Sequence, residues 1–373
     1  MIRYPSPRFG PFRRVGLLLA TLLLVVASGC REETPAISER FNAFGAQVNL
    51  SLVRVNPARA QRAIADIQSD FRFLETQLDP WHDGPMGRVN RLLPTGRPFV
   101  APPALMPVLH LARGYAERSR GLFNPTIGRL VELWGFNAPI PECHPPPSER
   151  SIQRLVAANP VPSDIRIQGL ELVGDNPALM LDFGPMVKGY AIDLAVERLR
   201  ELGVRDAQVR VGGTLRAIGD RSGQPWRVPV RRAAGSGVLG VVQIRGDGSV
   251  ATLAAADRDF IYGGVSYHSI LDPRTGWPVK DTLAVTVLHE DATTADAAAY
   301  ALFVAGPQHW YEVARVMGIG FVLLVDSRGT LHMNPEMRER IELIDSTAPV
   351  VLSPPLTGPR DGTETPDSTV SGR

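Results

Sequence analysis

Apolar residues follow two periods along this chain, one typical of strands and one typical of helices. Residues 47–53 alternate polar and apolar side chains, as a half-buried strand does, whereas residues 57–78 place apolar side chains three or four positions apart. Strands and helices are interspersed without strict alternation, so the pattern predicts an α+β fold rather than a doubly wound sheet. Further helices are expected over 104–119, 189–202, 294–304 and 310–316, and further strands over 207–211, 240–245, 282–289 and 320–326.

The first thirty residues do not follow this pattern. A basic segment ends in Arg13-Arg14, an apolar run covers residues 15–26, and small residues stand directly before Cys30. The run is shorter than the roughly 20 residues that span a membrane, and it is typical of a signal peptide. Small residues before a cysteine resemble a lipobox, in which Cys30 would carry lipid after cleavage. A simply cleaved signal peptide is the alternative.

The domain boundaries follow from these patterns. We expect a signal peptide over residues 1–29, a lipidated tether over 30–39, a folded domain over 40–345 and a disordered tail over 346–373. The tail is rich in Pro, Ser, Thr, Gly and Asp, and it has too few apolar residues to offset the entropy of ordering. The protein is therefore expected to be exported and anchored to a bacterial membrane, facing the periplasm or the cell exterior.

Composition and charge narrow the class of partner. The chain has 373 residues, 44% of them hydrophobic and 21% charged, which is enough for a sizeable globular core. Its net charge is +2, and loss of the four arginines in residues 1–29 gives +2 − 4 = −2. A nearly neutral protein has no general attraction for nucleic acid, so no nucleic-acid partner is expected. With Cys30 lipidated, Cys143 has no partner for a disulfide.

Candidate chemistry lies in segments that combine turn residues with polar side chains. A helix is expected to begin near Lys188, and N–H groups at a helix start suit a phosphate. His268 precedes an Asp-Pro-Arg-Thr-Gly turn and is a natural general base, although a lone histidine is more often structural. Asp296 opens a helix of small residues, where a carboxylate either caps the helix or holds a hard cation. The segments cover residues 121–128, 181–193, 209–214, 266–276 and 293–304.

In their order and spacing, these segments resemble the ApbE family of FAD:protein FMN transferases. The resemblance runs over residues 41–334, most of the expected domain. Its most specific part is 268–276, which is nearly the family's H-x-x-D-P-x-T-G motif. The other matches are 44–46 with Met-Gly-Thr, 121–128 with G-x-F-D-P-T, 182–193 with K-G-Y-A-x-D, and 295–304 with the A-D-A helix.

The resemblance implies a single α+β domain, T-fold-like, with a cleft for FAD. It implies that Mg²⁺ lies against the pyrophosphate and that a Thr or Ser hydroxyl of a target flavoprotein attacks the FMN-side phosphorus, releasing AMP. The partner would be a flavoprotein subunit of a membrane or periplasmic redox system. By the same resemblance His268 is the catalytic base, and Val187 (through its carbonyl), Asp296 and Tyr300 stand at metal-ligand positions. The residues at FAD-binding positions are Phe44, Leu122, Phe123, Asn124, Gly184, Lys188, Tyr190 and Leu271.

Several positions differ from the family's pattern, and they keep other functions open. A flavin-binding or assembly lipoprotein that has lost transfer is one alternative, and an enzyme that only splits FAD to FMN and AMP is another. Asn124 and Thr214 stand in place of Asp, Tyr300 in place of a Thr ligand, and Pro185 and Val187 in place of small residues. In addition, the family has an Asn near the position of Arg210, and it has Thr-Ser-Gly where this chain has residues 252–254.

Overall fold

The core of the protein is a nine-stranded sheet. The computed structural model describes residues 36–138, 141–233, 237–344 and 347–356, which belong to one compact unit. All neighbouring strands of this sheet pair antiparallel except β15 and β17, which are parallel. Its order is β1 (Ile37–Ala43), β2 (Ala46–Val53), β6 (Asp206–Val211), β7 (Thr214–Ile218), β10 (Gly248–Ala254), β13 (Thr282–His289), β14 (Phe321–Asp326), β15 (Leu331–Met333) and β17 (Val350–Leu352).

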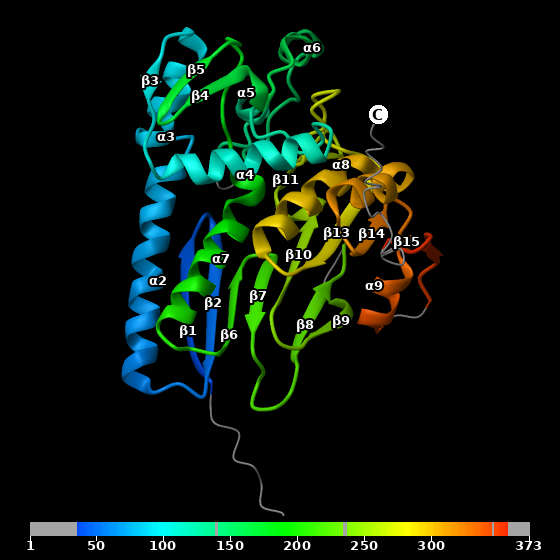
Figure 1. Cartoon of the computed structure of the whole chain (residues 1–373). Coiled ribbons are helices and arrows are strands. Elements are labelled where there is room, and N and C mark those ends of the chain that lie inside the picture. The colour runs from blue at the N-terminus through cyan, green and yellow to red at the C-terminus, as the bar shows by residue number, and fades with distance from the viewer. Residues whose placement is uncertain (1–35, 139–140, 234–236, 345–346, 357–373) are drawn as a thin grey trace, which may run out of the picture. The chain divides into compact units, whose positions relative to one another are not determined.

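Helices cover one face of this sheet. Figure 1 shows α7 and α8 lying along the sheet, with α2 beside its β1 edge and α4 crossing above. The alternating strands supply the buried side chains beneath them, such as Val48, Leu50 and Leu52 of β2. The helices are α2 (Pro57–Leu78), α3 (Pro85–Leu92), α4 (Leu105–Arg118), α5 (Gly128–Leu133), α6 (Glu149–Ala158), α7 (Gly184–Glu201), α8 (Ala292–Met317) and α9 (Pro335–Arg340), with 3-10 turns η1 (Leu93–Thr95), η2 (Pro162–Asp164) and η3 (Ala255–Asp257).

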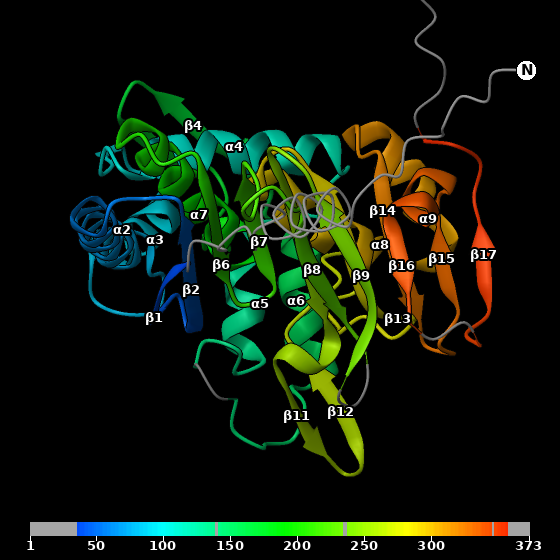
Figure 2. The same cartoon turned by 90° about the horizontal axis from the view of Figure 1, so that it is seen from below.

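Smaller sheets complete the fold. The sheet β16 (Ile341–Leu343), β9 (Val238–Ile244) and β8 (Trp226–Arg231) buries apolar side chains against the other face of the central sheet. A third sheet is formed by β3 (Phe99–Val100), β5 (Glu171–Gly174) and β4 (Ile165–Gln168). The hairpin of β11 (Asp259–Tyr262) and β12 (Val265–His268) extends away from the central sheet in Figure 2.

The structure confirms the α+β fold and corrects several boundaries. Helix α7 begins at Gly184, not at 189, because Pro185 is tolerated in the first turn. The helices expected over 294–304 and 310–316 both lie within α8, whose two parts are separated at Gly306, where φ of 71° and ψ of 178° are not helical. Strand β1 begins at Ile37, so the domain starts before residue 40.

The C-terminal prediction is wrong in part. Residues Val350–Leu352 form β17, which pairs with β15, although the composition of the tail predicts disorder. Backbone hydrogen bonds to an existing sheet edge order this stretch despite its exposed side chains. The predicted signal peptide and Cys30, the predicted site of lipidation, lie outside the described residues. None of the helices in the described part of the chain has the length and hydropathy that crossing a bilayer requires.

Candidate functional site

Asp296 is a buried carboxylate in the second turn of α8. Its side chain is only 9% exposed. Oδ2 accepts a hydrogen bond from the Gly189 N–H at 2.7 Å, and Oδ1 accepts one from the Thr214 hydroxyl. Burial raises the pKa of Asp296 to about 6, and the positive charge of Lys188 acts against this rise. Three elements, α7, α8 and β7, thus converge on one carboxylate.

Helix α7 approaches α8 closely at Gly189. A Cβ atom at this position would lie 2.2 Å from the Ala292 carbonyl oxygen, so only glycine fits. This close approach allows the Gly189 N–H to reach Asp296. Two residues that the sequence predicted for the site, Val187 and Lys188, directly precede Gly189 in the first turns of α7. The structure therefore brings the K-G segment and the A-D-A segment together.

Tyr300 lies one turn after Asp296 but makes other contacts. Its hydroxyl donates to the Leu271 carbonyl at 3.3 Å and accepts from the Leu271 N–H at 3.2 Å. Its ring meets the ring of Phe123 edge-on, with centroids 6.2 Å apart. Burial raises the pKa of Tyr300, so the phenol stays neutral. The structure thus gives Tyr300 a contact with the Leu271 backbone in place of the predicted metal ligation.

His268 is 6% exposed and is hydrogen-bonded to backbone through both ring nitrogens. Nε2 lies 2.6 Å from the Val279 carbonyl oxygen and must donate, so Nδ1 carries the lone pair and accepts from the Ile270 N–H at 3.3 Å. The ring packs edge-on against Phe303 of α8. Burial lowers the pKa of His268 and keeps it neutral. Its position as a base facing a substrate stays a prediction.

The spacing around His268 explains why it faces the interior. Three residues separate His268 from Asp272, whereas the motif H-x-x-D has two. Ser269 therefore occupies the motif's histidine position, three residues before Asp272. Neighbouring residues in an extended chain point to opposite sides, so a shift of one residue exchanges the buried side for the open one. Sequence reasoning missed Ser269, although counting the spacing identifies it.

The remaining predicted FAD-binding residues lie in two places. Leu122, Phe123 and Asn124 form the loop beneath Tyr300, and all three are buried. The Asn124 amide is engaged within the protein, since Nδ2 donates to the Pro160 carbonyl at 2.9 Å and Oδ1 accepts from the Thr126 hydroxyl at 2.6 Å. This side chain therefore fixes the loop rather than reaching out from it.

The other residues flank the sheet and the start of α7. Phe44 forms the β1–β2 turn in a left-handed conformation, with φ at 54°, and packs its ring against Phe71. Gly184 is the exposed first residue of α7, and its N–H donates to Asp182 at 2.8 Å. Tyr190 is half-buried, and burial raises its pKa. Phe44 thus contacts α2, and its N–H donates to the Glu75 carboxylate of the same helix at 2.9 Å.

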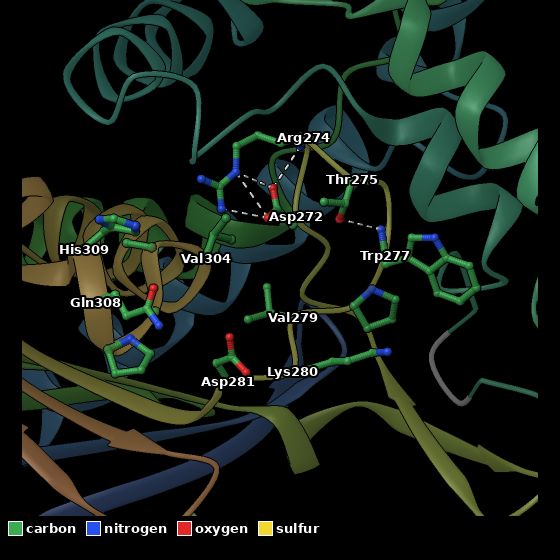
Figure 3. A pocket seen from close by; sticks show the side chains of 14 residues that line it. Asp272, Arg274, Thr275, Trp277, Val279, Lys280, Asp281, Val304, Gln308 and His309 are labelled. Atoms are coloured by element: carbon green, nitrogen blue, oxygen red, sulfur yellow. Dashed lines mark hydrogen bonds and ion pairs between the residues drawn. The ribbon is translucent and has the colours of Figure 1, made fainter.

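A cavity of about 450 Å³ adjoins this group of residues. It lies between residues 272–281 and the bend of α8, and Figure 3 shows Gln308 and His309 to the left of the Asp272–Arg274 ion pair. None of the predicted site residues lines it. We place the candidate site at Asp296 rather than at this cavity, because the matched segments converge there.

A metal ion at Asp296 would need ligands other than protein carboxylates, such as water or phosphate oxygens. The described residues contain no group of three or more His, Cys, Asp or Glu placed to hold a metal. Each Asp296 oxygen accepts one hydrogen bond and keeps a further lone pair. Mg²⁺ commonly binds through one or two carboxylates and completes its shell with water and substrate phosphate. The residues present fit that ion.

Known proteins resemble this chain in sequence over most of its length. A model of the ApbE family matches residues 44–323. An FAD:protein FMN transferase from Rhodobacter capsulatus is 36% identical over 346 residues, which cover 91% of this chain and 65% of that protein. An FAD:protein FMN transferase from Vibrio cholerae is 27% identical over 318 residues, covering 83% and 93% of the two chains.

Solved structures resemble it in fold. The ApbE protein from Thermotoga maritima aligns with a TM-score of 0.74 at 26% identity, covering 82% of this chain and 99% of that one. The apo form of the Pseudomonas stutzeri flavinyl transferase ApbE aligns with a TM-score of 0.68 at 28% identity, covering 78% and 92%. The fold of this chain is therefore shared with these ApbE proteins.

Proposed function

This chain belongs to the ApbE family, and from this membership we propose that it is an FAD:protein FMN transferase. One observation carries the proposal. Segments 182–193, 268–276 and 295–304, which resemble the family's motifs, lie far apart in the sequence and come together along helix α8. The relatives from Rhodobacter capsulatus and Vibrio cholerae that match most of this chain are named FAD:protein FMN transferases.

The proposed reaction transfers FMN to a Thr or Ser hydroxyl of a flavoprotein. The hydroxyl oxygen forms a bond to the FMN-side phosphorus, and the bond from that phosphorus to the bridging oxygen breaks. AMP leaves with the bridging oxygen, and the hydroxyl proton passes to a base or to the leaving phosphate. No electrons are exchanged, so the flavin needs no oxidant or reductant for this step.

We propose Mg²⁺ as the cofactor, held by the Asp296 carboxylate and the Val187 carbonyl. When bound, Mg²⁺ would offset the charge of the pyrophosphate. Burial makes the Asp296 carboxylate costly to ionise, and a bound cation would lower that cost. This relation supports a cation site at Asp296. Tyr300 is left out of the ligand set, since its hydroxyl is committed to Leu271 in both directions.

The partner and the location are also proposals. The flavin acceptor would be a subunit of a membrane or periplasmic redox system, reached by a protein that is anchored through lipid on Cys30. The leader segment before Cys30 supports export. Labelling cells with a radioactive fatty acid tests the anchor, because Cys30→Ser should abolish incorporation while the protein is still made.

A second function is favoured by two contacts. The His268 ring is bonded to its own loop, and the Tyr300 hydroxyl is bonded to Leu271, so neither is directed at Asp296. These contacts favour a protein that binds FAD without transferring FMN. An FAD pyrophosphatase is a third possibility, in which water replaces the acceptor hydroxyl.

One experiment separates the three functions. The purified domain is incubated with FAD and Mg²⁺, with and without a panel of periplasmic flavoprotein acceptors, and AMP and covalent flavin are measured beside a working homologue. A transferase releases AMP only with acceptor, a pyrophosphatase releases it without acceptor, and a binding protein releases none. Transfer should be lost in Asp296→Asn. Comparing His268→Ala with Ser269→Ala then shows which of the two neighbours affects the reaction.

A further inference from the structure

The first turn of helix α8 is bonded to helix α7 through the carboxylate of Asp193. Asp193 accepts hydrogen bonds from the Ala292 N–H at 2.9 Å, the Thr293 N–H at 2.8 Å and the Thr293 hydroxyl at 2.5 Å. The first N–H groups of a helix have no acceptor within it. The side chain of the capping residue of α8, Asp291, accepts the next N–H, that of Thr294, at 2.7 Å.

Asp193 itself is fixed by a buried arginine. Arg216 of β7 donates to it at 2.7 Å, and the same guanidinium forms two bonds of 2.9 Å with Asp247. The side chains of Arg216 and Asp193 are only 10% and 15% exposed. A guanidinium that binds two carboxylates in this way fixes the direction in which each carboxylate points. Arg216 of the sheet therefore fixes the Asp193 carboxylate, and this carboxylate in turn fixes the first turn of α8.

A further hydrogen bond joins α7 and α8 on the other side of the point where the two helices cross. Gly189 and Asp193 are four residues apart on α7 and share one face, and Ala292 and Asp296 are related in the same way on α8. At the crossing, the Gly189 Cα faces the Ala292 carbonyl with no room for a Cβ. Asp193 bonds to α8 before this crossing point, and the Gly189 N–H bonds to Asp296 after it.

We propose that Asp193 is a positioning residue that acts through the first turn of α8 to hold the Asp296 carboxylate against Gly189 and Thr214. Its bonds fix where α8 begins relative to α7, and Asp296 lies one turn further on. The functional part of this inference rests on the proposed role of Asp296 as a metal-binding carboxylate. The geometric part does not, because it concerns bonds within the protein.

Asp291 provides a matched control. It is also a carboxylate at the first turn of α8, but its bonds join it to Thr294 and His289 and do not reach α7. If Asp193 merely stabilised the helix end, Asp193→Ala and Asp291→Ala would have similar effects. If Asp193 positions Asp296, only Asp193→Ala would displace it. Asp193→Asn is the fallback should the alanine variant not fold, because one amide oxygen cannot accept three donors.

The test combines crystal structures with kinetics on the full chain. In Asp193→Ala or Asp193→Asn we expect the distance from Gly189 N to Asp296 Oδ2 to exceed about 3.5 Å, the limit of a hydrogen bond. We expect kcat to fall at least about tenfold with the KM for FAD less affected, since small displacements at a reacting centre cost rate. Asp291→Ala should keep the distance and stay within about threefold of the wild-type kcat.

Two results would overturn the inference. One is an unchanged distance in the Asp193 variants, and the other is an equal loss of distance and kcat in Asp291→Ala. Should the wild-type protein transfer no FMN at all, the proposed function fails, while the distances in the crystal structures still decide whether Asp193 positions Asp296. The two failures are thus distinguishable.

Discussion

Replacing Asp296 with asparagine should stabilise the protein at neutral pH. The carboxylate is buried, and its burial raises the pKa to about 6. Asparagine has the same shape, and its Oδ1 can accept the Gly189 N–H while its Nδ2 donates to the Thr214 hydroxyl oxygen. The variant therefore keeps both hydrogen bonds and removes a charge that is costly to bury.

The size and the pH dependence of the gain follow from the pKa. An unfolded aspartate has a pKa of about 3.9, so a folded value about 2 units higher corresponds to about 3 kcal/mol of lost stability when both states are ionised. Between pH 4 and 6, roughly, Asp296 binds more protons in the folded state than in the unfolded state, so its contribution to wild-type stability rises as pH falls. The advantage of Asp296→Asn should thus be greatest above about pH 6.5 and shrink towards zero near pH 4.

Urea unfolding at a series of pH values, followed by tryptophan fluorescence without added Mg²⁺, measures this difference. Asp291→Asn is the control, and its effect on the free energy of unfolding should have the opposite sign. Burial opposes ionisation of Asp291, but bonds from His289 and Thr294 outweigh it and lower its pKa to about 2. That variant should lose stability at neutral pH. An Asp296→Asn protein that is less stable than wild type at pH 7.5, or whose advantage does not change with pH, would refute the reasoning.

Three further perturbations test the packing around the site. Gly189→Ala should cost about 2–3 kcal/mol in urea unfolding, because its Cβ would meet the Ala292 carbonyl oxygen at 2.2 Å; an effect below 0.5 kcal/mol, roughly, contradicts this. Tyr300→Phe should cost about 1–3 kcal/mol, because the buried Leu271 N–H loses its acceptor, and an unchanged midpoint would contradict it. Burial lowers the pKa of His268, so His268 binds fewer protons in the folded state than in the unfolded state, and its contribution to stability should fall as pH drops below about 6.5. His268→Gln should remove this fall, and a variant with the same pH profile as wild type would argue against it.

The sequence alone determined much of the secondary structure. Helix α2 spans Pro57–Leu78 as the apolar spacing predicts, since Asn56 caps it and its buried face repeats with the helical period. Strand β13 likewise covers the predicted Thr282–His289. Both patterns are local, so neighbouring residues contain all the information that is needed.

Boundaries were less predictable where the rest of the fold decides them. The Gly-Pro pair at Gly184 resembles a turn, yet it lies inside the first turn of α7 because proline needs no N–H acceptor there. Strand β17 has no signal of its own in a polar tail, and it forms because β15 offers a free edge.

At the site, the sequence identified Asp296 and the segments around it, but only the tertiary structure assigned their contacts. Gly189 and Thr214 reach Asp296 from positions 107 and 82 residues away, and packing of α7 and α8 on the sheet brings them there. The same packing turns Tyr300 towards Leu271. Periodicity determines which face of an element is buried, whereas the partner across that face depends on how separate elements pack, which no local pattern contains.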